Sequence, residues 1–154
     1  MLGANEFPMG LFSNLFKTKP KANCETPLGS FILVYSKRNK NTWSNNSSEV
    51  LLSVRGSTTE PDADQLQFLK SWQTEISKLN DRINKRFIRE FKDADLPIDF
   101  THWSDKFKIV AVEVMMIFEQ EAYWNVTFEE MKEPFANFTL FIEGDKLTDF
   151  SIDT

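Results

Sequence analysis

An apolar stripe between residues 61 and 92 is the feature that most constrains the fold of this chain. Its members recur at steps of three and four residues: Leu66, Leu69, Trp72, Ile76, Leu79, Ile83 and Phe87. Side chains at this spacing lie on one face of an α-helix. Thr58 and Thr59 offer a hydroxyl cap and Pro61 suits the first turn, which together mark a helix start. We therefore predict one long amphipathic helix over about 61–92 that lies across a sheet.

Two strand patterns come before this helix. Residues 31–35 are apolar and aromatic, and residues 50–54 alternate between the two faces of a strand. We expect these strands to pair as a hairpin, joined by the long polar loop 37–48. Trp43 lies in that loop, where we expect its indole to be exposed.

Four strand patterns follow the helix, after a connector at 93–105. They occupy residues 107–118, 124–128, 138–142 and 147–152. Gly144-Asp145 is a two-residue hairpin turn, and short links of this kind favour antiparallel neighbours. The sequence therefore predicts a two-layer α+β fold: an antiparallel meander of about six strands, covered by the one long helix.

The length of the chain, 154 residues, fits a single domain. Residues 1–8 look unlike the rest, and we interpret them as a cloning or upstream extension. For residues 9–25 we expect a flexible segment with a short amphipathic helix. The α+β domain itself is then expected to occupy residues 26–154.

Cysteine and histidine, two of the residue types most often used in catalysis, each occur once in the sequence. Cys24 is its only cysteine and His102 its only histidine, and the two lie far apart along the chain. A thiol or hydroxyl nucleophile needs a base beside it, and the five glycines do not form a phosphate-binding loop. We therefore expect a binding protein rather than an enzyme, without a cofactor. Paired carboxylates are the one chemistry that the composition leaves open.

Acidic side chains concentrate in the last third of the chain. Residues 107–154 carry three basic and ten acidic side chains, a balance of −7, whereas the whole chain carries −5. Such a surface attracts and orients a basic protein partner, although it also serves solubility alone. We predict partner-binding residues among these glutamates and among exposed aromatic side chains of the sheet. The candidates are Trp43, Glu119, Glu121, Trp124, Glu129, Glu130 and Glu133.

Other kinds of partner have less support. The end of the predicted helix is basic, with Lys85, Arg86, Arg89 and Lys92, which complements the negative end of the helix dipole. A nucleic-acid surface is the alternative, but acids are interspersed, so we predict no nucleic-acid partner.

No apolar run reaches the roughly 20 residues of a membrane span. The lone cysteine suits a reducing, cytoplasmic compartment, and the apolar run 110–118 offers a surface for a homodimer.

Three segments carry a resemblance to known families. They are Pro27-Leu28-Gly29-Ser30-Phe31, Trp124-Asn125-Val126-Thr127-Phe128, and Phe138-Thr139-Leu140-Phe141 with the terminal hairpin. In these strand-and-turn patterns the chain resembles small bacterial families of unknown function, some of which are regarded as immunity proteins that neutralise a toxin by binding it. The resemblance implies a non-catalytic, cytoplasmic binder. It transfers no functional residue to this sequence.

Three functions are therefore to be compared. The first is a bacterial protein-binding module of immunity type that neutralises a basic partner. The second is an acidic binding protein like a secretion chaperone, although such chaperones close with a helix and this chain closes with strands. The third is a small carboxylate-dependent hydrolase or metal enzyme. It requires a concave site where His102 or the glutamates converge, since oxygen ligands suit divalent cations.

Overall fold

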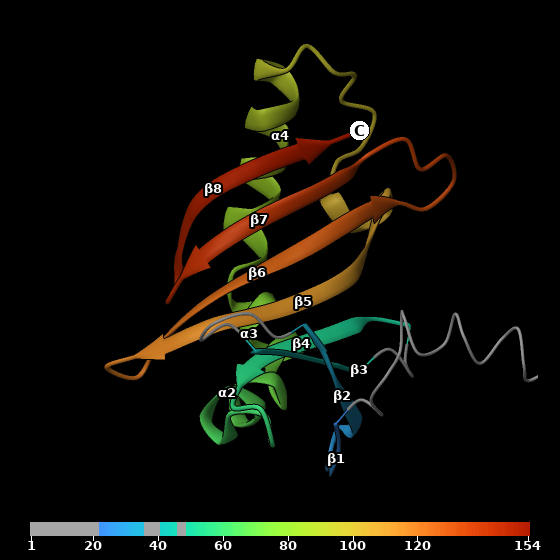
Figure 1. The fold of residues 1–154 in the computed structure, drawn as a ribbon. Coiled ribbons are helices and arrows are strands. Elements are labelled where there is room, and N and C mark those ends of the chain that lie inside the picture. The colour runs from blue at the N-terminus through green and yellow to red at the C-terminus, as the bar shows by residue number, and fades with distance from the viewer. Residues whose placement is uncertain (1–21, 36–40, 46–48) are drawn as a thin grey trace, which may run out of the picture.

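All strands in the described part of the chain belong to one sheet. The structure, a computed structural model, describes residues 22–35, 41–45 and 49–154. Eight strands lie side by side in the order of the sequence (Figure 1). They are β1 (Asn23–Thr26), β2 (Gly29–Tyr35), β3 (Asn41–Asn45), β4 (Leu51–Gly56), β5 (Phe107–Phe118), β6 (Glu121–Glu130), β7 (Asn137–Glu143) and β8 (Lys146–Asp153).

The sheet consists of two antiparallel halves joined in parallel. Successive strands from β1 to β4 and from β5 to β8 pair antiparallel. Between the halves β4 pairs parallel with β5, and Leu52 lies opposite Val112. A parallel pair needs a crossover connection, because the chain must return to the same end of the sheet. The helices between residues 63 and 93 form that crossover.

The predicted sheet was wrong in strand number and in topology. The structure has eight strands in a mixed sheet rather than about six in an antiparallel meander. The predicted hairpin of 31–35 with 50–54 does not form, because β3 lies between the two strands. The segment Asn41–Asn45 escaped notice because Trp43 is its one apolar side chain. Its buried asparagines instead donate their amides to backbone carbonyls of Gly56 and Leu28.

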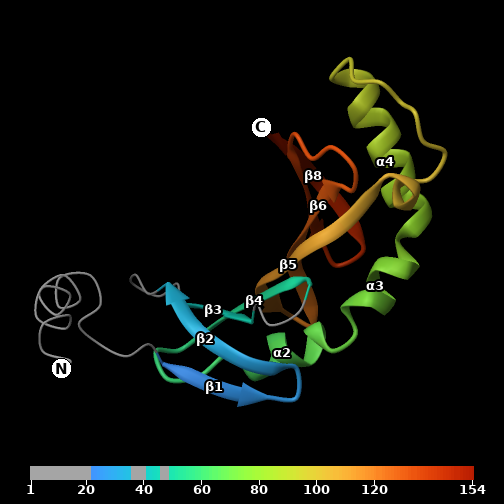
Figure 2. The ribbon, with the colours of Figure 1, turned by 90° about the vertical axis from the view of Figure 1, so that its right-hand side faces the viewer.

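The prediction of one long helix was also wrong. The chain forms three helices, α2 (Ala63–Leu69), α3 (Trp72–Lys78) and α4 (Asn80–Asp93). At each break an amide donates three residues back, from Ser71 N to Phe68 O at 3.1 Å and from Leu79 N to Ile76 O at 3.0 Å. A straight helix of 32 residues would extend about 48 Å. The breaks instead let the apolar stripe follow the bend of the sheet, which Figure 2 shows from the side.

The start of the helical region also differs from its prediction. Asp62, rather than Thr59, caps α2, because its Oδ1 accepts from Gln65 N at 3.0 Å. Thr59 lies in the preceding turn, where its hydroxyl contacts that of Ser57. Pro61 is buried and pairs with Gly56 in an isolated bridge. A capping side chain must sit immediately outside the first turn, and here that residue is the aspartate.

The strands and the hairpin turn predicted for the last third of the chain are confirmed. All four strand patterns form strands, and Gly144-Asp145 makes the turn between β7 and β8, with Gly144 at φ 63°. Gly144 N donates to Ala122 O at 2.8 Å, which ties this turn to β6. In β6 and β7 apolar and polar residues alternate strongly, because one face of each strand is buried.

An aromatic cluster joins α4 to the sheet. The ring of Phe87 lies within 4.9–6.2 Å of five other rings, centroid to centroid: Phe91, Phe107, Phe128, Phe138 and Phe150. Several of these contacts are edge-to-face, the geometry that aromatic quadrupoles favour. Six of the fifteen phenylalanines of the sequence therefore form the core between α4 and four strands.

The predicted extension 1–8 and most of the predicted flexible segment 9–25 lie outside the described residues. Within the described part, Asn23–Thr26 is already strand β1, so the sheet begins three residues before the predicted boundary at 26. Pro27 and Leu28 form the turn between β1 and β2, and Gly29 takes φ 108° after it. None of the described helices is long and apolar enough to cross a membrane.

Candidate partner-binding face

The strand registers define two faces of the sheet. On the side of the helices, the strands from β3 to β8 place buried side chains in one line: Asn45, Leu52, Val112, Val126, Leu140 and Phe150. Because side chains alternate along a strand, the neighbouring positions point to the other face. They form a line that crosses all eight strands: Asn23, Ile32, Ser44, Ser53, Glu113, Asn125, Phe141 and Asp149. We call this second side the open face, because no helix of the described chain lies on it (Figure 2).

A polar network occupies the centre of the open face. Arg55 Nη1 donates to Glu113 Oε2 at 2.7 Å, and Asn125 Nδ2 donates to Glu113 Oε1 at 3.3 Å. Next to this group the hydroxyls of Ser44 and Ser53 lie 2.7 Å apart. Ser53 and Asn125 are buried even though they face away from the helices. The centre of the open face is therefore an ordered polar surface whose groups largely satisfy one another.

Large apolar side chains surround this centre. Four of the eight most exposed large hydrophobic residues of the described chain lie on the open face: Tyr35, Leu51, Met116 and Phe118. Phe118, which is 57% exposed, stands at the end of the β5–β6 hairpin. Tyr123 on β6 and Phe141 on β7 add half-buried rings to the open face. Exposed apolar surface with a polar rim is typical of protein interaction sites.

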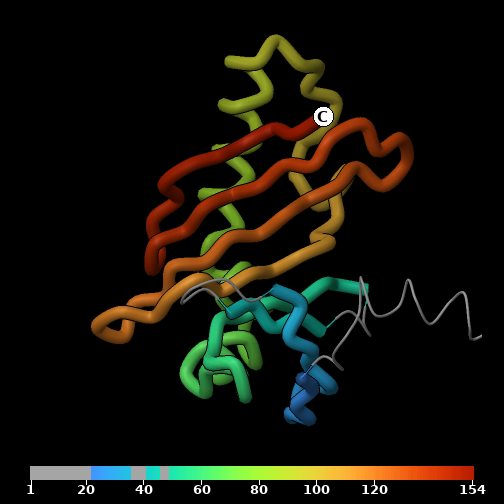
Figure 3. The backbone as a smooth tube through the Cα atoms, viewed as in Figure 1, coloured from blue at the N-terminus to red at the C-terminus, as the bar shows by residue number. Residues whose placement is uncertain are grey.

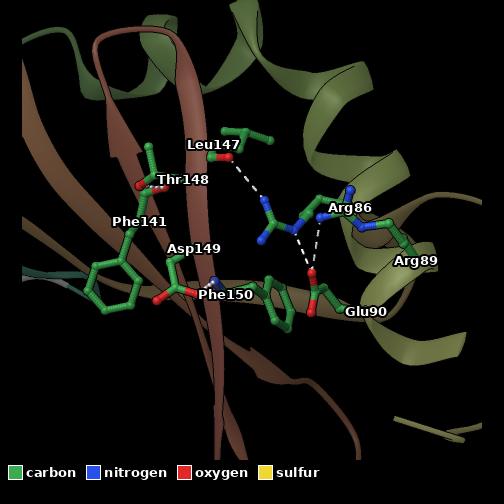
Figure 4. Close-up of polar contacts among 8 residues, drawn as sticks. All are labelled: Arg86, Arg89, Glu90, Phe141, Leu147, Thr148, Asp149 and Phe150. Carbon is green, nitrogen blue, oxygen red and sulfur yellow. Dashed lines mark hydrogen bonds and ion pairs between the residues drawn. The ribbon is translucent and has the colours of Figure 1, made fainter. Parts of the chain in front are cut away.

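Acidic side chains form one side of the rim. Glu129, Glu143, Asp149 and Asp153 lie on the open-face side of β6, β7 and β8. None of them has an ion-pair partner among the described residues. Figure 4 shows the alternation on β8: Asp149 points to one side with Phe141, whereas Leu147 and Phe150 point toward α4.

The five predicted glutamates do not form one cluster. Glu119 and Glu121 lie at the β5–β6 turn, whereas Glu133 lies in the loop after β6. These places are at opposite ends of β6 (Figure 1), whose ten residues extend roughly 30 Å. Glu129 and Glu130 are neighbours in sequence but point to opposite faces. Glu129 is on the open face, and Glu130 lies 4.0 Å from Lys106 Nζ on the helix side.

The two predicted tryptophans are not on the surface. Trp43 and Trp124 are both 0% exposed and point toward the helices. Trp43 Nε1 donates to Ser57 O at 2.9 Å, and the ring of Trp124 packs edge-on against Phe68 at 4.9 Å. The prediction that Trp43 is an exposed loop aromatic was therefore wrong. Neither indole is available to a partner.

Sequence reasoning missed the central residues of the open face. Arg55, Glu113 and Asn125 each lie inside a segment that was read only as a strand. A signal was present, because Glu113 is the one carboxylate in the otherwise apolar run 109–118. A charge inside an apolar strand needs a partner, but the sequence does not show that Arg55 lies beside it.

The side chains with catalytic potential have structural roles or lie apart. His102 caps the short 3₁₀ helix η1 (Trp103–Asp105), since its Nδ1 accepts from Ser104 N and its own amide donates to Asp105 Oδ2. Cys24 lines a groove of about 550 Å³ between the β1–β2 turn and the start of α2. Its neighbours there include Glu25, Glu60 and Asp62, but not His102. Within the ranges that the structure describes, no three His, Cys, Asp or Glu side chains are placed to hold a metal ion.

Comparisons of the chain with protein-family models, with curated proteins and with solved structures find no match.

Proposed function

We propose that this protein is a non-catalytic binding module that holds a basic protein partner on the open face of its sheet. The observation that carries the proposal is the face itself. It combines a line of side chains across eight strands with exposed apolar groups and no helix of the described chain above it. Antiparallel sheets tolerate one solvated face, and its residues are ordinarily polar. Here the solvated face instead exposes four large apolar side chains, those of Tyr35, Leu51, Met116 and Phe118.

The size of the face suits a protein rather than a small molecule. Eight strands at about 4.8 Å spacing extend roughly 34 Å, and same-side residues repeat about every 7 Å along each strand. Three such rows cover on the order of 700 Å², close to the roughly 800 Å² that each partner contributes to a standard interface. The groove of about 550 Å³ near β1, by contrast, lies at the edge of the sheet, beside the start of α2.

The charge of the face indicates the class of partner. Four unpaired carboxylates line the rim at β6, β7 and β8, and Glu113 is already neutralised by Arg55. Two basic residues lie on the β5–β8 rows that carry these acids, Lys108 opposite Glu129 and Lys146 opposite Glu143. Complementary charge speeds the encounter of two proteins and disfavours wrong partners. A partner with a basic contact surface is therefore the best fit.

An immunity-type role is the biological form of this proposal. In that role, binding alone neutralises the partner, and the bound protein needs no reactive group. This part of the proposal rests on the strand-and-turn resemblance of Trp124–Phe128 and Phe138–Phe141. It is consistent with the structural use of His102 and with the separate positions of the glutamates.

Site-specific photo-cross-linking tests the proposal. Benzoylphenylalanine at Thr139, in the middle of the open face, is compared with the same group at Lys78, which is exposed on α3. The cross-linked protein is identified by mass spectrometry, purified and titrated against the unmodified chain. We expect a basic protein that is captured only when the cross-linking group is at position 139. Equal capture from both positions would contradict the assignment of the face.

Two matched pairs of variants then locate the contact in the reconstituted complex. Asp149→Lys on the open face is expected to weaken binding at least tenfold, whereas Asp93→Lys at the end of α4 leaves it unchanged. Glu129→Gln should slow association and Glu130→Gln should not, because only Glu129 is on the open face. Equal effects within both pairs would show that binding responds to net charge and not to this surface.

A further inference from the structure

A basic groove lies on the helix side of the sheet, between α4 and the β7–β8 turn. It has a volume of about 440 Å³ and is lined by Arg82, Lys85, Arg86, Arg89, Asp145, Lys146 and Leu147. Five of these seven residues are cationic and one is anionic, a balance of +4 in a chain whose net charge is −5. The groove is therefore positively charged, whereas the molecule as a whole is negatively charged.

The walls of the groove are held together by two arginines of α4. Arg82 Nη1 donates to Asp145 O at 2.7 Å, and Arg86 Nη1 donates to Leu147 O at 3.0 Å. Arg86 Nε also donates to Glu90 Oε2 at 2.6 Å, and Figure 4 shows this side chain between Glu90 and Leu147. These bonds connect the helix to the turn. The cationic wall is thus preorganised, which reduces the entropy that a ligand must overcome on binding.

Two further cations of α4 project from this wall into solvent. Arg89 is 61% exposed and meets only Glu90, at 3.3 Å, and Lys85 has no ion pair within the described residues. Positions 82, 85 and 89 follow one stripe of the helix, separated by about 4.5 and 6 Å along its axis. An extended peptide repeats its same-side residues about every 7 Å. Carboxylates on such a peptide can therefore meet Lys85 and Arg89, whereas Arg82 already lies 3.7 Å from Asp145 Oδ2.

We propose that this groove binds an extended acidic segment of a protein. None of the seven lining residues is aromatic, whereas proteins that bind single-stranded nucleic acid stack bases on aromatic rings. An acidic peptide needs only the positive charges that line the groove. The site is independent of the open face, because Arg86 and Asp149 lie on opposite sides of β8 (Figure 4).

Fluorescence polarisation of the full chain with a labelled decaglutamate peptide tests this site. We expect saturable binding at about 50 mM salt that weakens at about 200 mM, because screening shortens the range of exposed charges. Lys85→Glu with Arg89→Glu should weaken the peptide at least tenfold. The control variant Lys70→Glu with Lys132→Glu changes the net charge equally outside the groove and should alter binding less than twofold.

A third variant and a second probe complete the test. Lys146→Glu alters the wall opposite α4 and should also weaken decaglutamate, with an unchanged circular dichroism spectrum. Absence of saturable peptide binding, or equal weakening by the groove and control variants, overturns the site. Tighter groove-dependent binding of an oligothymidine of equal length overturns the choice of a protein segment in favour of nucleic acid. Neither result affects the proposal for the open face.

Discussion

Arg55 and Glu113 join the two halves of the sheet. The guanidinium Nη1 of Arg55, on β4, lies 2.7 Å from Oε2 of Glu113, on β5, and these strands are the parallel pair of the described sheet. Their side chains are 25% and 32% exposed, so water screens the pair only in part. Asn125 extends the contact to β6 by donating to the other carboxylate oxygen. The interaction therefore links three strands across the junction.

The first prediction concerns this junction. Arg55→Ala and Glu113→Ala should each lower the free energy of unfolding by about 1–2 kcal/mol, because each leaves a half-buried charge without its partner. The double variant should cost less than the sum, with a coupling of about 0.5–1 kcal/mol. Urea denaturation of the four proteins measures the cycle. Additive single effects would show that the two charges do not interact in solution.

The second prediction contrasts the two buried tryptophans. Trp43 Nε1 donates to Ser57 O, whereas Trp124 Nε1 has no acceptor among the described atoms. Replacement by Phe removes similar volume at both sites, but only at Trp43 does it also leave a carbonyl without its donor. We expect Trp43→Phe to be more destabilising than Trp124→Phe by about 1 kcal/mol. Thermal and urea unfolding of the two variants provide the comparison, and the reverse order would contradict the hydrogen-bond assignment.

The third prediction concerns the start of α2. Asp62→Ala removes the side chain that accepts from Gln65 N and should cost about 1 kcal/mol of stability. Thr59→Ala changes an exposed residue of the preceding turn and should cost less than about 0.5 kcal/mol. The pair is compared by urea midpoint. A larger loss of stability in Thr59→Ala than in Asp62→Ala would show that a threonine hydroxyl caps α2, as the sequence pattern predicts.

The fourth prediction is a dependence on acid. The hydrogen bond from Lys106 holds the pKa of Asp99 below its usual range, and the charge of Lys106 contributes to the same effect. The ionised form is therefore favoured in the folded state. The resulting stabilisation is fully present above about pH 4, the pKa of an unfolded aspartate, and is lost as pH falls through the lower folded value.

Replacing the carboxyl group isolates this contribution. Asp99→Asn should lower the urea midpoint at pH 6 slightly, because Asp99 is exposed, and should reduce the further decrease between pH 5 and pH 3. Asp93→Asn, which has no ion pair in the described structure, serves as the control and should keep the full decrease. An unchanged acid profile for Asp99→Asn would show that Lys106 and Asp99 do not interact in solution.

The parts of the fold that could be predicted are those where one strong pattern acts alone. In β6 the buried Trp124, Val126 and Phe128 alternate with polar residues, so the strand and its buried face follow from sequence. In β3 two inward positions are asparagines that bond to backbone, and no alternation of hydropathy remains. The helix breaks at Ser71 and Leu79 were hidden for another reason. They preserve the apolar stripe while the axis changes direction.

The candidate site was harder to predict because sequence neighbours need not share a face. Glu129 and Glu130 looked like one acidic pair, yet the period of two in a strand separates them. Conversely, Ser53, Glu113 and Asn125 lie far apart in the sequence and side by side in the sheet. The proximity of Ser53 to the other two depends on the parallel pairing of β4 with β5. Local patterns carry no information about that pairing.

The same parallel pairing also bears on how the chain folds. Within each half, every strand meets its sequence neighbour, so these contacts close short loops. The junction instead brings Ser53 to Glu113, sixty positions away along the chain, and closing a long loop costs conformational entropy before any contact offsets it. We therefore expect the two hairpin series to form early and their union to limit the rate. Substitutions that weaken the β4–β5 junction, or a half that forms before it, should therefore slow refolding more than they speed unfolding.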